Sequence, residues 1–458
     1  MNIVPTEYKL DTKPVNMINA SEYEMVEVRS DDNIILNAQN IRIQLKDLST
    51  FTNLYNAYIE VHFRVVKDAH TEAVPALYTA DDRIALTNSV ASLFSRCVLR
   101  LQNNIVEVLD EQHISAIVKG LLLYSDDYTR TTGTNELWFK DTGDCDATAT
   151  SQLPFSHAQV QLGAADSLKI VENPNYNKGF AKREALCRAS QTVVAHIPLS
   201  TMFGFCSIDR VITGNLVALE FTKSQATDHL HAGRNADNTA QTADGKVLLD
   251  KMSLWCPRIM PSPQIDLELK SAIGGGLVSD YKYAVFNSYV SSTIPDSTNS
   301  QNVFKVLTQS EKILQAFVFF RKSGRSQADP KWKTIINDKL SELEVRLNGK
   351  TYPARRYSEL TTAVGRSRAY LELVKFMNKS TNYDSGIQLS LEEWKNTSIY
   401  AFDLRAQPEN WSKSPSTLEV VGSFTGNIGI AGNWNVCVVS ERHTQINYSG
   451  SQPVVNVM

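Results

Sequence analysis

The stretch LRLQNN at residues 99–104 is a strand pattern that runs into a turn, and VRLNGK at residues 345–350 repeats it. Apolar and polar residues alternate in both stretches, which is the period of a strand with one buried face. The Asn-Asn and Asn-Gly pairs favour tight hairpin turns. Apolar strand patterns precede the two stretches, at 58–65 and 314–321, and helical patterns follow them. The two blocks lie about 200–250 residues apart, which is the length of one β-sandwich domain. The order of elements therefore predicts a duplicated sandwich.

Period-two alternation dominates wherever the sequence has a clear period. In YIEVHFRV (58–65), Ile59, Val61, Phe63 and Val65 share one face and the opposite face is polar, as in a half-buried antiparallel strand. Comparable segments lie at 97–101, 217–221, 314–321, 343–347, 398–404, 417–421 and 434–440. Turn-forming pairs separate most of them, at Asn103-Asn104, Gly214-Asn215, Asn348-Gly349 and Gly432-Asn433. The chain is therefore predicted to be mainly β.

Two helical stripes interrupt the strands. After Asp110, which can serve as an N-cap, apolar residues follow the spacing of an amphipathic helix, at Ile114, Ile117, Val118, Leu121 and Leu122. A weaker stripe begins at Ser358 and contains Leu360, Val364, Leu371 and Val374, with Gly365 inside it. Each half of the chain is thus expected to contain a short helix.

The length of 458 residues is too great for one compact core and fits two domains. A polar stretch at 224–246 is the expected boundary, and the strand-like VLLDKMSLWC after it is expected to open the second half. Four other long polar segments are expected to be loops used in assembly or exposed on the surface, at 125–157, 164–190, 271–301 and 378–388.

Composition and charge exclude several classes of protein. Hydrophobic residues make up 42% and charged residues 21%, as in a soluble globular protein. A formal charge of −3 argues against a dedicated nucleic-acid binder. The first residues carry no signal-peptide pattern, and no apolar run is long enough to span a membrane. Six widely spaced cysteines without a CxxC pair predict reduced, mostly buried thiols.

The sequence lacks the common signatures of catalysis. It contains no GxSxG nucleophile elbow, no GxxxxGK[ST] phosphate loop and no dinucleotide fingerprint. We therefore expect no enzymatic activity, no catalytic or cofactor-binding residues, no metal ligands and no cofactor.

Three sets of polar residues nevertheless have a functional alternative. His229 and His231 beside Asp228 could bind a metal, but a solvated polar loop is favoured. A fragment of a calcium loop lacks its downstream Glu, at Asp141, Asp144 and Asp146. Basic residues could contact DNA phosphates, although ion pairing between subunits or a solvated face is favoured, at Arg321, Lys322, Arg325, Arg355, Arg356, Arg366 and Arg368. The scattered histidines are expected to be structural, at His62, His113, His196 and His443.

Several strings resemble a known family. They are ALTNSVASLFSRCVLRLQNNIVEV (85–108), HISAIVKGLLLYSDDYTRTTGT (113–134), HIPLSTMFGFCSIDRVITGNLVALEF (196–221), SIYAFDLRAQ (398–407) and STLEVVGSFTGNIGI (416–430). In their order they resemble the double jelly-roll major capsid proteins of Polinton-like viruses, adintoviruses and virophages. The resemblance covers most of residues 30–440 and rests on that order, because no single string is diagnostic.

This resemblance implies two tandem jelly-roll β-sandwiches with short helices. The implied division is an N-terminal arm (1–29), a first jelly roll (30–235), a second jelly roll (236–445) and a C-terminal tail (446–458). It also implies homotrimers that form pseudo-hexagonal capsomers and build an icosahedral shell around double-stranded DNA, in virions assembled in the host cytoplasm or nucleus. The implied partners are neighbouring capsomers and penton and minor capsid proteins, with at most weak nonspecific DNA contact. We further hypothesise that both termini lie at the inner side of the shell and tie capsomers together.

Two other functions remain open at this point. One is a tandem jelly-roll enzyme such as a glycan-processing amidase, against which the missing secretion signal and disulfide framework argue. The other is a viral surface carbohydrate-binding protein or minor capsid protein, which would be expected to expose aromatic patches. The aromatic residues here mostly alternate within predicted strands.

Overall fold

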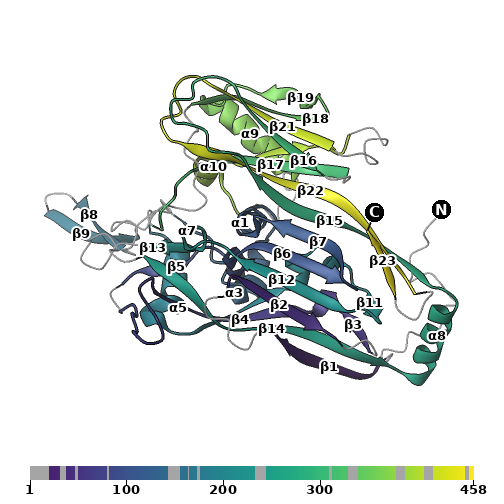
Figure 1. The fold of residues 1–458 in the computed structure, drawn as a ribbon. Coiled ribbons are helices and arrows are strands. Elements are labelled where there is room, and N and C mark those ends of the chain that lie inside the picture. Colours follow the sequence, from purple (N-terminus) through teal and green to yellow (C-terminus); the bar gives the residue numbers. More distant parts are fainter. Residues whose placement is uncertain are drawn as a thin grey trace.

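The computed structural model describes residues 20–30, 38–46, 50–79, 82–142, 155–162, 165–172, 176–232, 244–308, 312–327, 339–377, 387–406, 416–448 and 453–457. Strands dominate these ranges and form two β-sandwiches that lie one above the other (Figure 1). All strand pairs in the sheets are antiparallel.

The first sandwich consists of two sheets. One has the order β10 (Val193–Pro198), β4 (Tyr58–Lys67), β14 (Gly245–Pro261), β3 (Phe51–Asn53) and β11 (Val211–Thr213), and β1 (Ala20–Arg29) also pairs with β14. The other has the order β2 (Asn40–Leu45), β12 (Val217–Lys223), β6 (Phe94–Leu101) and β7 (Asn104–Asp110).

The second sandwich has the same two-sheet construction. One sheet has the order β15 (Val278–Val290), β22 (Gly432–Asn447), β17 (Lys312–Lys322) and β20 (Tyr400–Asp403), with β23 (Val454–Val457) also on β22. The other has the order β16 (Asn302–Thr308), β21 (Ser416–Phe424), β18 (Leu340–Leu347) and β19 (Lys350–Tyr357).

Helices and short hairpins fill the connections. The hairpins are β5 (Ile84–Leu86) with β13 (Leu230–Ala232) and β8 (Phe155–Leu162) with β9 (Ala165–Glu172). The α-helices are α1 (Gln112–Leu122), α2 (Asp126–Arg130), α3 (Thr132–Asn135), α5 (Lys178–Cys187), α6 (Leu199–Met202), α7 (Ala226–His229), α8 (Pro263–Gly274), α9 (Ala363–Phe376) and α10 (Leu391–Thr397). Short 3-10 turns are η2 (Leu54–Asn56), η3 (Val90–Leu93), η4 (Arg188–Ser190) and η5 (Phe205–Ser207).

The predicted strand faces are confirmed. In β4 the four apolar residues from Ile59 to Val65 are fully buried, and the intervening Tyr58, Glu60, His62 and Arg64 are half-buried. Six of the seven other predicted strands lie within β6, β12, β17, β18, β21 and β22, and the seventh, 398–404, extends beyond both ends of β20. Alternation identifies these strands because an antiparallel sandwich buries one face of each sheet and leaves the other to solvent.

The predicted hairpin turns are confirmed in part. Asn348 and Gly349 both have positive φ between β18 and β19, as a two-residue hairpin turn requires. The first-sandwich turn is one residue earlier than predicted, because Gln102 and Asn103 have the positive φ angles and Asn104 already begins β7. Gly432 is no turn but the first residue of β22, where a side chain would overlap Phe320 and the Arg321 carbonyl oxygen.

Both predicted helices exist, with different details. Asp110 ends β7, and the residue before α1 is Glu111 in a left-handed conformation without a side-chain cap. The apolar stripe predicted for the second helix is wrong, because Val364 is 66% exposed. The buried residues of α9 are Gly365, Ala369 and Leu373. Gly365 belongs to the helix because its lack of a side chain allows contact with the Glu359 carbonyl.

Two long strands fall where the sequence predicted otherwise. VLLDKMSLWC does not open the second half, since β14 pairs with β4 and β1 of the first sandwich. The supposed loop 271–301 contains the whole of β15. These pairings favour a changeover between the sandwiches after Pro261, at α8, rather than within 224–246, and the division of the chain into domains remains a proposal.

The thiol prediction is confirmed for the described cysteines. Cys97, Cys187, Cys206, Cys256 and Cys437 are buried and free, and Cys145 lies outside the described residues. Within the described ranges, no helix is both long and apolar enough to cross a membrane.

Candidate functional site: the junction between the sandwiches

The two sandwiches share their cores. Helix α1 follows β7 of the first sandwich, yet its apolar residues pack in the core of the second, at Ile114, Ile117, Val118, Leu121 and Leu122. In return, strands of the second sandwich place residues in the first core, at Tyr281, Tyr283, Val285, Ile446 and Val455. Figure 1 shows α1 between the two sandwiches. Because separating the halves would expose apolar surface of both, the hydrophobic effect holds them together.

Buried Glu107 and partly buried Lys119 fix the connection between β10 and β11 at this junction. The carboxylate of Glu107 on β7 accepts hydrogen bonds from the backbone N–H groups of Gly204 and Phe205, at 2.9 and 3.0 Å. The ammonium group of Lys119 on α1 donates to the carbonyl oxygens of Thr201 and Met202, both at 3.1 Å. The segment 201–205 is thus held from two elements at once.

Burial opposes the charge on both groups. It raises the pKa of Glu107, against the effect of the two backbone N–H groups, and it lowers the pKa of Lys119. A buried charge is tolerated only where hydrogen bonds replace its lost hydration. The four hydrogen bonds to segment 201–205 supply that replacement, so these residues serve architecture rather than catalysis.

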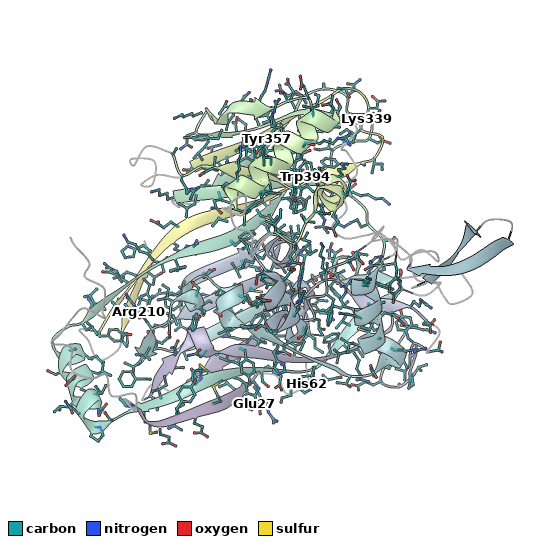
Figure 2. The ribbon with its side chains drawn as sticks, turned by 180° about the vertical axis from the view of Figure 1, so that it is seen from behind. Glu27, His62, Arg210, Lys339, Tyr357 and Trp394 are labelled. Atoms are coloured by element: carbon teal, nitrogen blue, oxygen red, sulfur yellow. The ribbon has the colours of Figure 1, made fainter. Side chains whose placement is uncertain are left out.

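Further hydrogen bonds connect β7 directly to the second sandwich. The carbonyl oxygen of Val106 accepts from the Tyr283 hydroxyl at 3.1 Å and from the Arg442 guanidinium at 3.0 Å. The Asn104 amide donates to the Val455 carbonyl oxygen at 3.1 Å. Nearer α8, Arg210 of the first sandwich, labelled in Figure 2, donates to the Asp280 carbonyl oxygen on β15 at 2.9 Å.

A cluster of ionisable residues lies at the other end of the junction. Asp228 on α7 lies 2.8 Å from Arg325, which follows β17 of the second sandwich. His113 on α1 lies 3.7 Å from Asp228 and is buried. Burial lowers the pKa of His113 to about 3, so the imidazole is neutral at physiological pH. Residues of α1, α7 and the second sandwich therefore meet here.

The basic residues considered as DNA contacts mostly have partners within the chain. Arg325 pairs with Asp228, and Arg356 with Glu342 at 3.1 Å. Arg366 donates to the carbonyl oxygens of Leu360 and Thr361. Arg321 is buried, and the Arg355 side chain lies outside the described residues. The predicted set therefore does not form one exposed basic surface.

The metal candidates behave differently from expectation. His229 and His231 are buried, so the solvated loop expected there is wrong. The Ser224 hydroxyl lies 2.8 Å from His229 Nδ1, and the His231 ring packs edge-on against Phe180. Neither contact is metal ligation. Among the residues that the structure describes, no group of three or more His, Cys, Asp and Glu could hold a metal ion.

The remaining candidate residues, Asp141 and the histidines His62 and His196, contact other side chains of the same chain. Asp141 is buried and pairs with Arg183 at 2.6 Å, whereas Asp144 and Asp146 lie outside the described residues. On the outer face of the first sandwich, His62, which is labelled in Figure 2, lies 2.8 Å from a carboxylate oxygen of Glu60, and His196 lies 3.5 Å from the other oxygen.

The junction residues were not predicted as a site. Glu107 and Lys119 occupy ordinary positions on a strand and a helix, and no local motif marks them. One sequence signal existed, since Lys119 lies beside the apolar stripe of α1 and separates Val118 from Leu121. That pattern indicates that Lys119 lies beside the apolar face of α1, but it does not indicate which atoms Lys119 contacts.

No family model matches this chain, and no curated protein matches it. Solved structures do match. A chain of the Sputnik virophage structure is 10% identical, with a TM-score of 0.59 over 100% of this chain and 93% of that one. The Faustovirus major capsid protein is 9% identical, with a TM-score of 0.56 over 95% and 92%. The mavirus major capsid protein is 11% identical, with a TM-score of 0.53 over 99% and 95%.

These matches run through both sandwiches and the junction. The chain has the double jelly-roll fold of viral major capsid proteins. At 9–11% identity the likeness is one of fold. In this double jelly roll the shared cores and the hydrogen bonds from β7 to the second sandwich hold the two jelly rolls together.

Proposed function

We propose that this chain is a major capsid protein of a virus of the Polinton-like or virophage type, and that it is not an enzyme. The observation that carries the proposal is the extent of the double jelly-roll likeness, which spans 95–100% of this chain in the three matches above. A single jelly-roll module shared with another protein would match over one sandwich only.

We infer that three copies form a pseudo-hexagonal capsomer. Each chain carries two similar lobes, so a trimer has six and can occupy a position with six neighbours in an icosahedral lattice. Cyclic trimers require a closed, heterologous contact between different faces of neighbouring copies. The junction supports this use, because a fixed angle between the lobes of each chain is needed for the ring to close.

The proposed partners are other copies of this chain, neighbouring capsomers, and penton and minor capsid proteins. The shell would enclose a double-stranded DNA genome with at most weak nonspecific contact to it, since the chain carries a formal charge of −3. The proposed location is the virion, after assembly in the host cytoplasm or nucleus.

The arrangement of the end strands supports a role for both termini in linking capsomers. Ala20 of β1 pairs with Pro261, the last residue of β14 and two residues before α8 begins. Val454 of β23 pairs with Asn447 of β22, which also pairs with Val278, the first residue of β15 after α8. The two terminal strands therefore flank the same end of the molecule. We propose that this end faces the shell interior.

Light scattering on the purified chain, followed by negative-stain imaging, tests the proposal. The expected result is a mass of three chains and pseudo-hexagonal particles. A stable monomer that forms no such particle under any condition of salt or concentration would refute it.

A further inference from the structure

A groove lies between α8 and the nearby end of the first sandwich, and we call it the α8 groove. Residues of β3, β11, β14 and α8 line it, together with Tyr448 and Pro453, which follow β22 and precede β23. Its volume is about 510 Å³, which lies in the range of sites that hold a bound ligand. Figure 1 shows α8 at the end of the molecule where β1 begins.

The apolar side of α8 is only partly covered at this groove. Ile265, Leu269 and Ile273 recur every four residues and therefore share one side of the helix. All three are half-buried, and no residue of α8 is buried. Leu267 of the same helix is 71% exposed. Apolar side chains that stay partly uncovered beside a groove are typical of a surface that contacts another chain.

Residues 1–19 lead to the same end of the molecule. They precede Ala20, which pairs with Pro261, and Pro261 lines the α8 groove. Their sequence, MNIVPTEYKLDTKPVNMIN, intersperses apolar with polar residues and has two acidic and two basic side chains. Pro5 and Pro14 disfavour a continuous helix and favour an extended course. Such a segment is suited to lie extended in a groove with its apolar side chains against the protein.

The strand pairing separates each groove from the N-terminal segment of its own chain. Arg258 and Ile259 of β14 pair with β1 along one edge and with β3 along the other edge. Residues of β3 and β11 line the groove, so it lies on the β3 side of β14, whereas Ala20 lies on the β1 side. To enter its own groove, the segment before Ala20 would have to turn back around the end of β14. The segment of a second copy has no such restriction.

We propose that the α8 groove of each copy binds residues 1–19 of a neighbouring copy, whose apolar side chains cover Ile265, Leu269 and Ile273. Nineteen extended residues span at most about 65 Å, which exceeds the width of roughly 40 Å of a domain of 200 residues. Exchange of identical segments links copies without a further protein. The inference rests on the proposed capsid function and names the contact that ties capsomers together.

Cross-linking between separately purified full-length variants tests the proposal. Lys270→Cys places a thiol on α8 at the groove, where the lysine side chain is 69% exposed, and Tyr8→Cys places a thiol in the N-terminal segment. The two proteins are mixed under assembly conditions and treated with a short bismaleimide, and we expect a product of two chains. The control replaces Lys270→Cys by Val364→Cys, at an exposed position on α9 of the second sandwich. This pair should give no product above that of the unaltered chain.

Electron microscopy of the same mixtures separates this inference from the capsid role. Shells without the two-chain product would overturn the groove assignment and leave the capsid role intact. The same holds for shells in which a chain that carries both substitutions is cross-linked only within itself. Absence of both shells and the two-chain product would overturn both proposals.

A synthetic peptide of residues 1–19 provides a second measurement on the same full-length proteins. Added in excess to the cross-linking mixture, it should compete for the α8 groove and cause loss of the two-chain product and of shells. A peptide of the same composition in scrambled order should cause neither loss. Equal effects of the two peptides would refute binding of this segment in the groove.

Discussion

Glu107 shows how a single carboxylate can fix a connection at the junction between the sandwiches. Its side chain is fully buried, and both oxygens accept backbone N–H groups of the β10–β11 connection. Lys119 holds the same connection from α1. Single residues stabilise the junction in this way because each replaces water with specific hydrogen-bond partners.

Replacing Glu107 should therefore destabilise the protein far more than replacing an exposed glutamate. Glu107→Ala leaves two buried N–H groups without an acceptor, and we expect a loss of about 2–5 kcal/mol in the free energy of unfolding. Glu342→Ala removes a partly exposed partner of Arg356 and should cost about 1 kcal/mol or less. Urea unfolding of both variants measures the difference. Equal losses would contradict the structural role given to Glu107.

His113 should make stability depend on pH. Its pKa is about 3 in the folded protein, against 6.5 for an ordinary histidine, so the unfolded chain binds more protons between these values. The contribution of His113 to stability should be constant above about pH 6.5 and should fall by up to ~1.4 kcal/mol per pH unit as the pH drops below it.

The variant His113→Gln should lose this contribution. Urea unfolding at pH 7.5 and at pH 5 measures the change in the free energy of unfolding for each protein. The drop between the two pH values should be smaller in the variant than in the unaltered chain. His443→Gln is the control, because His443 lies on the surface beside Asp280, and it should preserve the drop. An identical drop in all three proteins would refute the assignment to His113.

At the scale of elements, the β10–β11 connection packs between the two sandwiches. Gly204 lies against β15 of the second sandwich, and a side chain there would overlap the Ala284 carbonyl oxygen. The φ angle of Gly204 is negative, so glycine is needed for the close approach and not for an unusual backbone conformation.

Gly204→Ala should therefore destabilise the fold by steric overlap alone. We expect a loss of about 1–3 kcal/mol, typical of overpacking, because the obstructing atom belongs to backbone. Gly426→Ala is the matched control, since nothing lies within 4 Å of its side-chain position. Thermal unfolding of the two variants compares them. An unchanged Tm for Gly204→Ala would show that Gly204 is not tightly packed against β15.

At the scale of the whole molecule, the two terminal strands meet at the α8 end. Strand β1 pairs with one edge of β14, and its loss would leave that edge unpaired there. Because the first core is built from the other strands, the subunit should fold without the first part of β1.

Deleting residues 1–25 should leave soluble trimers but block shell assembly. The deletion removes the first half of β1, and light scattering with electron microscopy measures both outcomes. Deletion of residues 1–19 keeps all of β1 and separates the effect of the strand from that of the residues before it. Shells of normal size and yield from the 1–25 deletion would refute the proposed linking role.

The sequence by itself determined strands such as β4 and β18, the buried face of β4 and the duplicated order of elements. YIEVHFRV and VRLNGK encode these features locally, because the alternation of side chains and the positive φ of Asn348-Gly349 depend on near neighbours alone. Only the tertiary structure decided that β14 joins the first sandwich, that α1 enters the second core, and that Arg321, His229 and His231 are buried. Each of these depends on a partner distant in the sequence, and periodicity shows that a face is buried but not what covers it.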